Sequence, residues 1–212
     1  MDAVDSSGGP RGRPLSSLTL IGLIVAALVT VEAVDAFLLG DRLQARGIAP
    51  RRIDRLDGIL WAPFLHDGWG HLASNAIPLS VLGWLASLRG RAYWVTVTVA
   101  AHLIGGALVW LLATGFNHIG ASGVVFGYFG ALLGGAWVDR RPAPLARALV
   151  AVLLYSTMIV GLVPQDDISW EGHLAGLVVG LAVARRLVEP PPAPADDGPL
   201  YPWEQDEPWR DG

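Results

Sequence analysis

The sequence predicts an all-α membrane protein that crosses the bilayer six times. Hydrophobic residues make up 52% of the 212 residues and charged residues only 16%, a balance that soluble domains rarely have. A helix needs about 20 apolar residues to cross a bilayer core about 30 Å thick, and six stretches of about that length occur. They are residues 18–39, 69–88, 92–113, 121–138, 145–163 and 171–188.

Both ends of the chain have the composition of polar tails. Residues 1–16 combine Asp, Ser and Gly with two arginines, and we expect them to form a cytoplasmic tail. Residues 189–212 are rich in proline and acidic residues and lack an apolar helical face, so we expect them to be disordered. Residues 17–188 then form one membrane domain. Its first apolar run is too long for a signal-peptide core and is interpreted as a retained span.

The arginines predict that both termini lie in the cytoplasm. All 15 basic residues are arginine, and arginines in short loops favour the cytoplasmic side. They precede the first span, follow the second, fourth and sixth, and are absent after the third and fifth. Those that fit this pattern are Arg11, Arg13, Arg89, Arg91, Arg140, Arg141, Arg185 and Arg186. We therefore expect a multi-pass protein of the cell membrane, whose second, fourth and sixth spans begin at the extracytoplasmic face.

The loop after the first span disagrees with this pattern. Residues 42–55 contain five arginines, which by themselves would favour the cytoplasm. Ile53, Leu56 and Leu60 fall at helical spacing, which indicates a short amphipathic helix on the outer leaflet. The majority of the loops still favour the orientation with both termini inside.

Three polar motifs stand at the start of the second, fourth and sixth spans. His71 and Asn75 begin the second, Gly120-Ala121-Ser122-Gly123 opens the fourth, and Gly172-His173-Leu174-Ala175-Gly176 opens the sixth. Because these spans run in the same direction, their first residues share one face of the membrane. Polar side chains are expensive in hydrocarbon, and at this depth they indicate a functional site.

Ser122 and His173 are the candidate nucleophile and base. Serine attacks poorly until a base takes its proton, and a neutral imidazole is the usual base. Small residues four apart allow two helices to approach closely in lipid. The glycines that have this spacing on the fourth and sixth spans are Gly123, Gly127, Gly172, Gly176 and Gly180. The alternative is that these glycines only pack helices or mediate dimerisation.

His71 and Asn75 are candidate donors to an oxyanion. They are four residues apart, so they share one face of a helix, and both can donate a hydrogen bond. The backbone N–H of Ser122 is a further donor, because amides at a helix start are unpaired. Taken singly, His71 or Asn75 is better explained as a helix cap or an interhelical hydrogen bond.

Several other classes of function are excluded by the composition. The chain has no cysteine, which excludes disulfides, thiolate metal sites and cysteine nucleophiles. The His-Glu-x-x-His zinc motif is absent, and Val124 interrupts a Gly-x-Ser-x-Gly elbow. We therefore expect no metal and no cofactor. The net charge of −4 is too mild to indicate a nucleic-acid partner.

These motifs resemble those of the rhomboid family of intramembrane serine proteases, over residues 60–187. The resemblance includes the tripeptide Phe64-Leu65-His66 and the residue runs 120–127 and 172–180. It implies a six-transmembrane-helix rhomboid-like bundle in the lipid bilayer. It also implies a Ser122–His173 dyad that cleaves transmembrane protein substrates through an acyl-enzyme.

The resemblance further implies roles for the neighbouring residues. His71, Asn75 and the Ser122 backbone would contact the oxyanion, and Phe126 would pack against the catalytic imidazole. One departure concerns an adjacent Trp-Arg pair that the family often has in the first outer loop. Here Arg55 and Trp61 are separated.

Two other functions are weighed against the protease. The first is an inactive relative that binds transmembrane clients, but such relatives usually lose the serine or the histidine, and this chain has both. The second is a small transporter with Glu32 and Asp35 as coupling carboxylates. For these two residues we favour an interfacial position beside the loop arginines, and the internal repeats that a transporter would have are not found.

Overall fold

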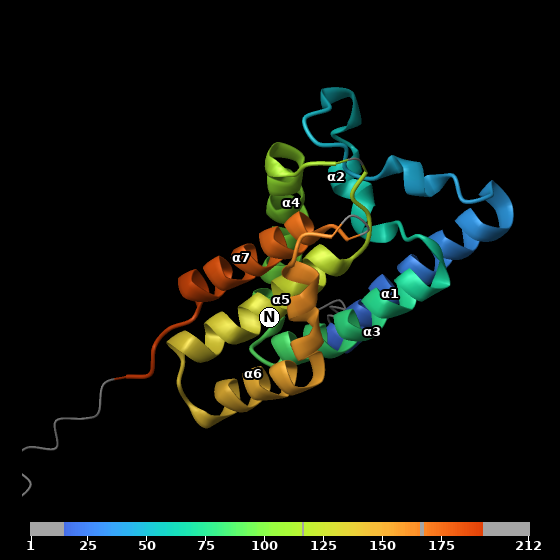
Figure 1. The fold of residues 1–212 in the computed structure, drawn as a ribbon. Coiled ribbons are helices and arrows are strands. Elements are labelled where there is room, and N and C mark those ends of the chain that lie inside the picture. The colour runs from blue at the N-terminus through green and yellow to red at the C-terminus, as the bar shows by residue number, and fades with distance from the viewer. Residues whose placement is uncertain (1–14, 116, 166–167, 193–212) are drawn as a thin grey trace, which may run out of the picture.

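A computed structural model describes residues 15–115, 117–165 and 168–192, and the regular structure of these residues is helical (Figure 1). The predicted all-α class is confirmed. The predicted tails 1–16 and 189–212 lie outside the described residues, apart from residues 15–16 and 189–192. Two isolated antiparallel bridges, Ile48 with His118 and Gln165 with Ile168, are the exceptions to the helical structure in the described part.

The described residues form seven α-helices, one more than the six predicted. They are α1 Ser17–Val34, α2 Gly58–Trp61, α3 Gly68–Ser87, α4 Arg91–Leu112, α5 Ser122–Val138, α6 Pro142–Tyr155 and α7 Trp170–Leu187. A π-helical turn, Asp35–Leu39, extends α1, and a 3₁₀ segment, Ser156–Leu162, extends α6. The six long segments coincide with the six apolar stretches to within a few residues. The additional helix, α2, is a single turn inside the loop between α1 and α3.

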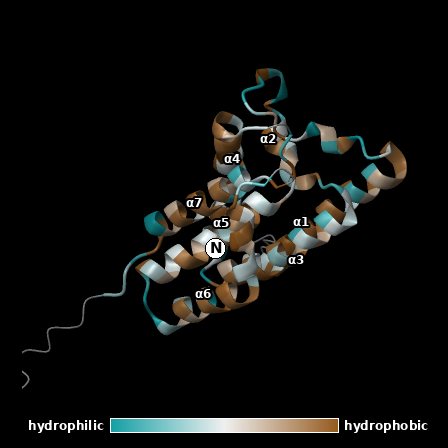
Figure 2. Cartoon of the chain, in the orientation of Figure 1, coloured by the Kyte–Doolittle hydropathy of each residue, from teal (hydrophilic) through white to brown (hydrophobic). Residues whose placement is uncertain are grey.

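Three of the long segments are long and apolar enough to cross a membrane. In the described part of the chain these are Ser17–Leu39, Arg91–Leu112 and Pro142–Leu162, and α5 is a shorter apolar helix. Figure 2 shows the bodies of the helices as mainly hydrophobic and the connecting loops as mainly hydrophilic. The fold therefore contains helices with the length and hydrophobicity of membrane-spanning helices.

Helix α5 lies at the centre of the bundle, in contact with α3, α4, α6 and α7 (Figure 1). Most of its residues are buried on every side of the helix, including the aromatic side chains of Phe126, Tyr128 and Phe129. The Tyr128 hydroxyl forms a hydrogen bond of 2.8 Å with the Thr98 hydroxyl of α4. A helix that is apolar all round needs such complete coverage by neighbours or lipid.

Helices α5 and α7 approach closely along their glycines. A β-carbon on Gly176 would collide with the carbonyl oxygen of Gly123, and one on Gly180 would collide with that of Gly127. These contacts allow α7 to lie with its backbone against the backbone of α5. Gly172 also lies at this contact, because a β-carbon on Gly123 would be 3.4 Å from the Gly172 carbonyl oxygen, while a β-carbon on Gly172 itself would lie 2.7 Å from the Ser169 hydroxyl.

The loop between α1 and α3 is more broken than the predicted amphipathic helix. Residues Ile53–Arg55 form a 3₁₀ turn, and α2 begins after it at Gly58. The loop also folds back on itself, since a β-carbon on Gly58 would collide with the carbonyl of Gly47. The backbones of Ile48 and His118 exchange two hydrogen bonds of 2.9 Å, which attach this loop to the segment that precedes α5.

Candidate active site

A cavity of about 1040 Å³ opens at the end of the bundle where α3, α5 and α7 begin. It is lined by polar side chains from all three helices, by the segments that precede them and by the 3₁₀ segment Ser156–Leu162. The residues singled out in the sequence that line it are His71, Asn75, Ser122, Phe126 and His173. Three motifs that are far apart in the chain therefore meet in one place.

Ser122 is the first residue of α5, and the turn before it is held by specific contacts. Gly120 has a φ of +104°, which favours glycine, and its N–H donates to the Ala62 carbonyl at 2.9 Å. A β-carbon on Gly120 would also lie 2.9 Å from Nε2 of His71. Glycine is thus needed at position 120 both for the turn and for the approach of the His71 ring.

His66 holds the same turn through a hydrogen bond to its backbone. Its ring is buried, and its Nε2 accepts a hydrogen bond of 3.4 Å from the N–H of Ala121. Burial lowers the pKa of His66 to about 4, so the ring is neutral near pH 7 and this nitrogen can accept. In the sequence His66 belongs to a motif that carries the resemblance, and nothing local to it shows which backbone group it contacts.

His173 is held by a hydrogen bond and by a stacked ring. Its Nδ1 lies 2.7 Å from the carbonyl oxygen of Gly161. Because a carbonyl can only accept, Nδ1 carries the proton, and the neutral ring then has an unprotonated Nε2. The Phe126 ring stacks on the imidazole with a centroid distance of 4.3 Å and an interplanar angle of 12°. The Gly161 contact could not be found from sequence, since it uses only a backbone atom.

His71 has the opposite tautomer. The N–H of Asp67 donates to His71 Nδ1 at 3.2 Å, so in the neutral ring the proton lies on Nε2, the nitrogen closest to Gly120. One turn later, Asn75 is buried and its Nδ2 donates to the His71 carbonyl at 2.9 Å. An amide nitrogen carries two hydrogens, so one remains for a second acceptor. Both side chains can therefore donate into the cavity.

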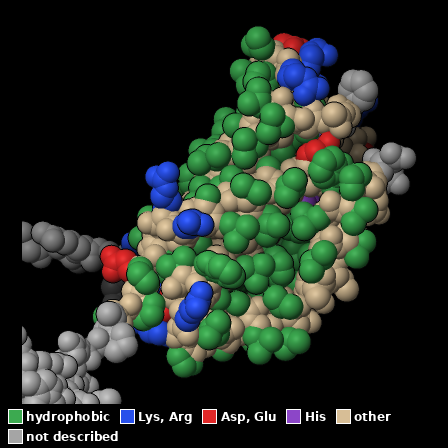
Figure 3. Space-filling view, turned by 60° about the vertical axis from the view of Figure 1, so that its left-hand side comes forward, with side chains coloured by type: hydrophobic (Ala, Val, Ile, Leu, Met, Phe, Trp, Pro, Cys, Tyr) green, Lys and Arg blue, Asp and Glu red, His purple; other side chains and the backbone are tan. Residues whose placement is uncertain are grey.

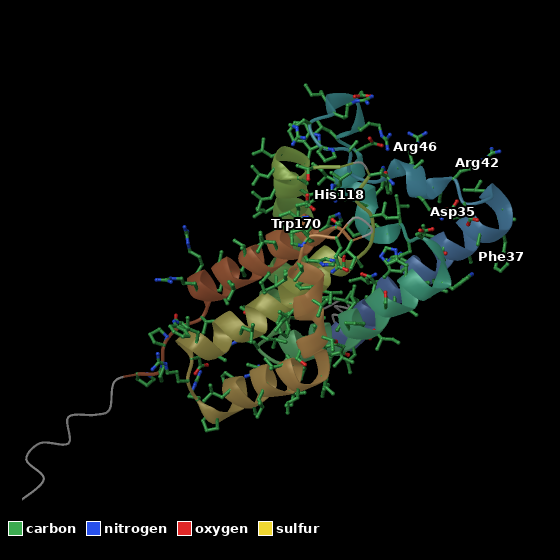
Figure 4. The ribbon with its side chains drawn as sticks, in the orientation of Figure 1. Asp35, Phe37, Arg42, Arg46, His118 and Trp170 are labelled. Atoms are coloured by element: carbon green, nitrogen blue, oxygen red, sulfur yellow. The ribbon has the colours of Figure 1, made fainter. Side chains whose placement is uncertain are left out.

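The rim of the cavity ties the segment before α5 to the start of α7. His118 Nδ1 lies 2.7 Å from the Ser169 hydroxyl, and His118 Nε2 lies 3.1 Å from the Thr114 carbonyl. One carboxylate oxygen of Glu171 accepts from both the N–H and the hydroxyl of Thr114. Figure 4 shows His118 and Trp170 close together at this junction. Sequence reasoning did not identify these contacts of Thr114 and Ser169, which exist only in the folded chain.

The comparisons with known proteins agree with the motifs in the cavity. A family model described as the rhomboid domain matches residues 54–190, which include every residue of the site discussed above. The chain belongs to the rhomboid family. Within this rhomboid domain, α3, α5 and α7 carry the polar cavity residues that the sequence singled out.

Relatives of this rhomboid domain occur in bacteria and in eukaryotes. An uncharacterised protein of Mycobacterium tuberculosis is 37% identical over 182 residues, which cover 81% of this chain and 75% of the relative. The "RHOMBOID-like protein 5" of Arabidopsis thaliana is 28% identical over 62% of this chain and 44% of its own length. The "Rhomboid-like protease 5" of Toxoplasma gondii is 27% identical over 58% of this chain and 15% of its own length.

The two carboxylates near the end of α1 are buried in the protein, and Asp35 lies beside the arginine-bearing loop, as the sequence predicted. Glu32 is 2% exposed and Asp35 is 3% exposed. Asp35 Oδ1 accepts from the backbone N–H groups of Arg42 and Leu43 at 2.8 and 2.9 Å. Figure 4 shows Asp35 beside the loop that carries Arg42. In this rhomboid domain Asp35 therefore terminates α1 and orders the following turn, a structural role that does not favour ion coupling.

We expect Asn75→Ala to lower the rate at which Ser122 reacts with a fluorophosphonate by about 10²-fold. The phosphonyl oxygen carries developing negative charge as a carbonyl oxygen would, and one lost donor of this kind costs about 10²–10³ in rate. Ser74→Ala is the matched control, because Ser74 also lines the cavity but donates only to the His71 carbonyl of its own helix. An equal loss in both variants would contradict a donor role for Asn75.

Proposed function

We propose that this rhomboid-family protein is an intramembrane serine endopeptidase that cleaves transmembrane protein substrates with Ser122 and His173. The observation that carries the proposal is the hydrogen bond between His173 Nδ1 and the Gly161 carbonyl. It leaves the other ring nitrogen of His173 as a base in the cavity that Ser122 lines. A backbone carbonyl thus has the orienting role that a carboxylate has in a triad, which is consistent with a dyad.

In the proposed reaction His173 Nε2 removes the proton of the Ser122 hydroxyl, and Oγ attacks the carbonyl carbon of a substrate peptide bond. The tetrahedral intermediate collapses when the imidazolium gives its proton to the leaving amine. An ester between Ser122 and the N-terminal part of the substrate remains. A water molecule, deprotonated by the same imidazole, hydrolyses the ester and restores Ser122.

The oxyanion of the intermediate would be held by three donors. They are the backbone N–H of Ser122 at the start of α5, the Nε2–H of His71 and the second Nδ2–H of Asn75. The tautomer of His71 supports this assignment, since the ring nitrogen nearest to the serine turn carries its proton. The N-terminal end of α5 adds a favourable dipole for negative charge.

We further propose that α1, α3, α4, α5, α6 and α7 are the six spans of a membrane domain over residues 17–188. Helices α3 and α7 have 20 and 18 residues and are largely apolar, which suits a crossing when the other helices surround them. The arginines at the end of the bundle opposite the cavity support an arrangement with both termini cytoplasmic and the cavity open to the extracytoplasmic side. The tails 1–16 and 189–212 would lie on the cytoplasmic side.

The proposal is tested by covalent labelling of the detergent-purified protein with a fluorescent fluorophosphonate. We expect the wild type and Ser74→Ala to be labelled and Ser122→Ala to be unlabelled, since only an activated serine reacts. Ser74 is the control because it is a second serine that lines the same cavity. Labelling that persists in Ser122→Ala would show that another serine is the nucleophile. A folded wild type that is not labelled would overturn the enzyme and favour an inactive client-binding relative.

A further inference from the structure

Arginines gather at the end of the bundle opposite the cavity. This end contains the end of α3, the start of α4, the end of α5 and the start of α6. Its arginines near the α5–α6 connection are Arg89, Arg140, Arg141 and Arg147. Figure 3 shows basic side chains on the left of the view, beside a broad hydrophobic surface. This cluster is not used by the proposed reaction.

Asp139 neutralises only part of this charge. Its buried carboxylate accepts from Arg141 Nε and Nη2 at 2.7 and 2.8 Å, and from Arg89 Nη1 at 3.2 Å. These hydrogen bonds, with Arg141 as the main partner, hold the pKa of Asp139 well below its usual range. Asp139 therefore carries one negative charge, and both of its oxygens already have arginine partners.

Arg147 is half-buried and lacks a carboxylate partner among the described residues. Its Nε donates to the Ala143 carbonyl of its own helix at 3.1 Å. Arg147 and Arg89 both line a narrow cleft of about 10 Å³ together with Tyr93. Leaving a partly buried charge uncompensated is costly, so the cleft favours an anion at its mouth.

We propose that the mouth of this cleft binds the phosphate group of an anionic phospholipid. Guanidinium groups are suited to phosphate because their planar N–H pairs match two of its oxygens. The cleft also lies near the start of α6, a helix of 14 residues, because Pro144 lines it, and the helix dipole there favours negative charge. The cleft is too narrow to admit the phosphate, so the phosphate would stay at the depth of the lipid headgroups. Arg147 and Arg89 would contact it there.

The surface beside the cleft distinguishes a lipid from a free phosphate. Val150 and Leu154 lie three and seven residues after Arg147, on the same face of α6, and they are 40% and 59% exposed. An acyl chain can follow these side chains from the arginine along the helix, whereas inorganic phosphate would gain nothing from them. The combination of a cationic cleft and an exposed apolar track is the chemistry of an amphiphilic ligand. It does not depend on the proposed protease activity.

The test is the rise in thermal unfolding temperature when phosphatidylglycerol is titrated into the full-length protein in a neutral detergent. We expect phosphatidylglycerol to stabilise the wild type and Arg147→Gln to need about tenfold more lipid for the same rise, the effect of losing one charge-assisted contact. Arg186→Gln is the control, because Arg186 is an exposed arginine in the last turn of α7. Arg147→Lys keeps the charge without the planar N–H pair, so it tests the site if Arg147→Gln does not fold, and an intermediate loss is expected.

Several outcomes would overturn the proposal. Equal weakening by Arg186→Gln would mean general attraction to a basic surface, and an equal effect of phosphatidylcholine would mean that the headgroup charge is irrelevant. Stabilisation by inorganic phosphate as large as that by phosphatidylglycerol would identify a free-anion site instead of a lipid site. Wild-type affinity in Arg147→Lys or Arg147→Gln would remove Arg147 from the contact.

Discussion

Replacing His173 with alanine is expected to lower the rate of fluorophosphonate labelling at Ser122 by about 10³-fold. In the proposed mechanism the serine loses the base that accepts its proton, and general-base catalysis by a positioned imidazole contributes a rate factor of about 10²–10⁴. The imidazole contacts the Phe126 ring and the Gly161 carbonyl, and it lines a large cavity. Its removal therefore enlarges this cavity and adds no clash. The unfolding temperature is therefore expected to change little, and the loss should be confined to the labelling rate.

His118→Ala is the informative comparison for this prediction. His118 also lines the cavity, but its Nδ1 pairs with the Ser169 hydroxyl and its Nε2 with the Thr114 carbonyl, so neither nitrogen is left to take a proton. We expect a loss of no more than about tenfold, from looser positioning of the loop before Ser122. If His118→Ala abolished labelling and His173→Ala retained it, the base would be His118, and the proposed dyad would be wrong.

The long helices could be predicted from sequence because each is a continuous apolar stretch with polar residues at its ends. Ser16, for example, caps α1 by accepting from the N–H of Thr19, and Pro142 begins α6. The loop between α1 and α3 could not be predicted in the same way. It folds back on itself through a close contact between Gly47 and Gly58, which no local pattern in the sequence shows.

In the candidate site, too, some residues could be predicted from sequence and others could not. Ser122, His173, His71 and Asn75 could be singled out because polar side chains at the start of apolar stretches are conspicuous. The groups that orient them could not, because they act through atoms that every residue possesses or through distant side chains. The carbonyl of Gly161 sets the tautomer of His173, and His66 holds the N–H of Ala121. Both partners lie outside α3, α5 and α7, since Gly161 belongs to the 3₁₀ segment after α6 and His66 precedes α3.

Gly176→Ala is expected to destabilise the protein and to slow labelling at Ser122, although position 176 contains no reacting group. The new β-carbon would collide with the carbonyl oxygen of Gly123, a backbone atom that cannot rotate away. Helix α7 must then move from α5, at a cost of about 1–3 kcal/mol in the free energy of unfolding. His173 is three residues before position 176, and a displacement of about 1 Å between base and nucleophile costs about 10²-fold in rate.

Gly22→Ala is the matched control, because Gly22 lies within α1 and a β-carbon there would have nothing within 4 Å. Alanine is the better helix former by about 1 kcal/mol, so Gly22→Ala should be neutral or slightly stabilising and should leave labelling unchanged. The same chemical change therefore has opposite expected effects at the two positions, and only the contact with α5 distinguishes them. Wild-type stability and labelling in Gly176→Ala would show that α5 and α7 can separate without cost, and that their close approach does not set the distance between Ser122 and His173.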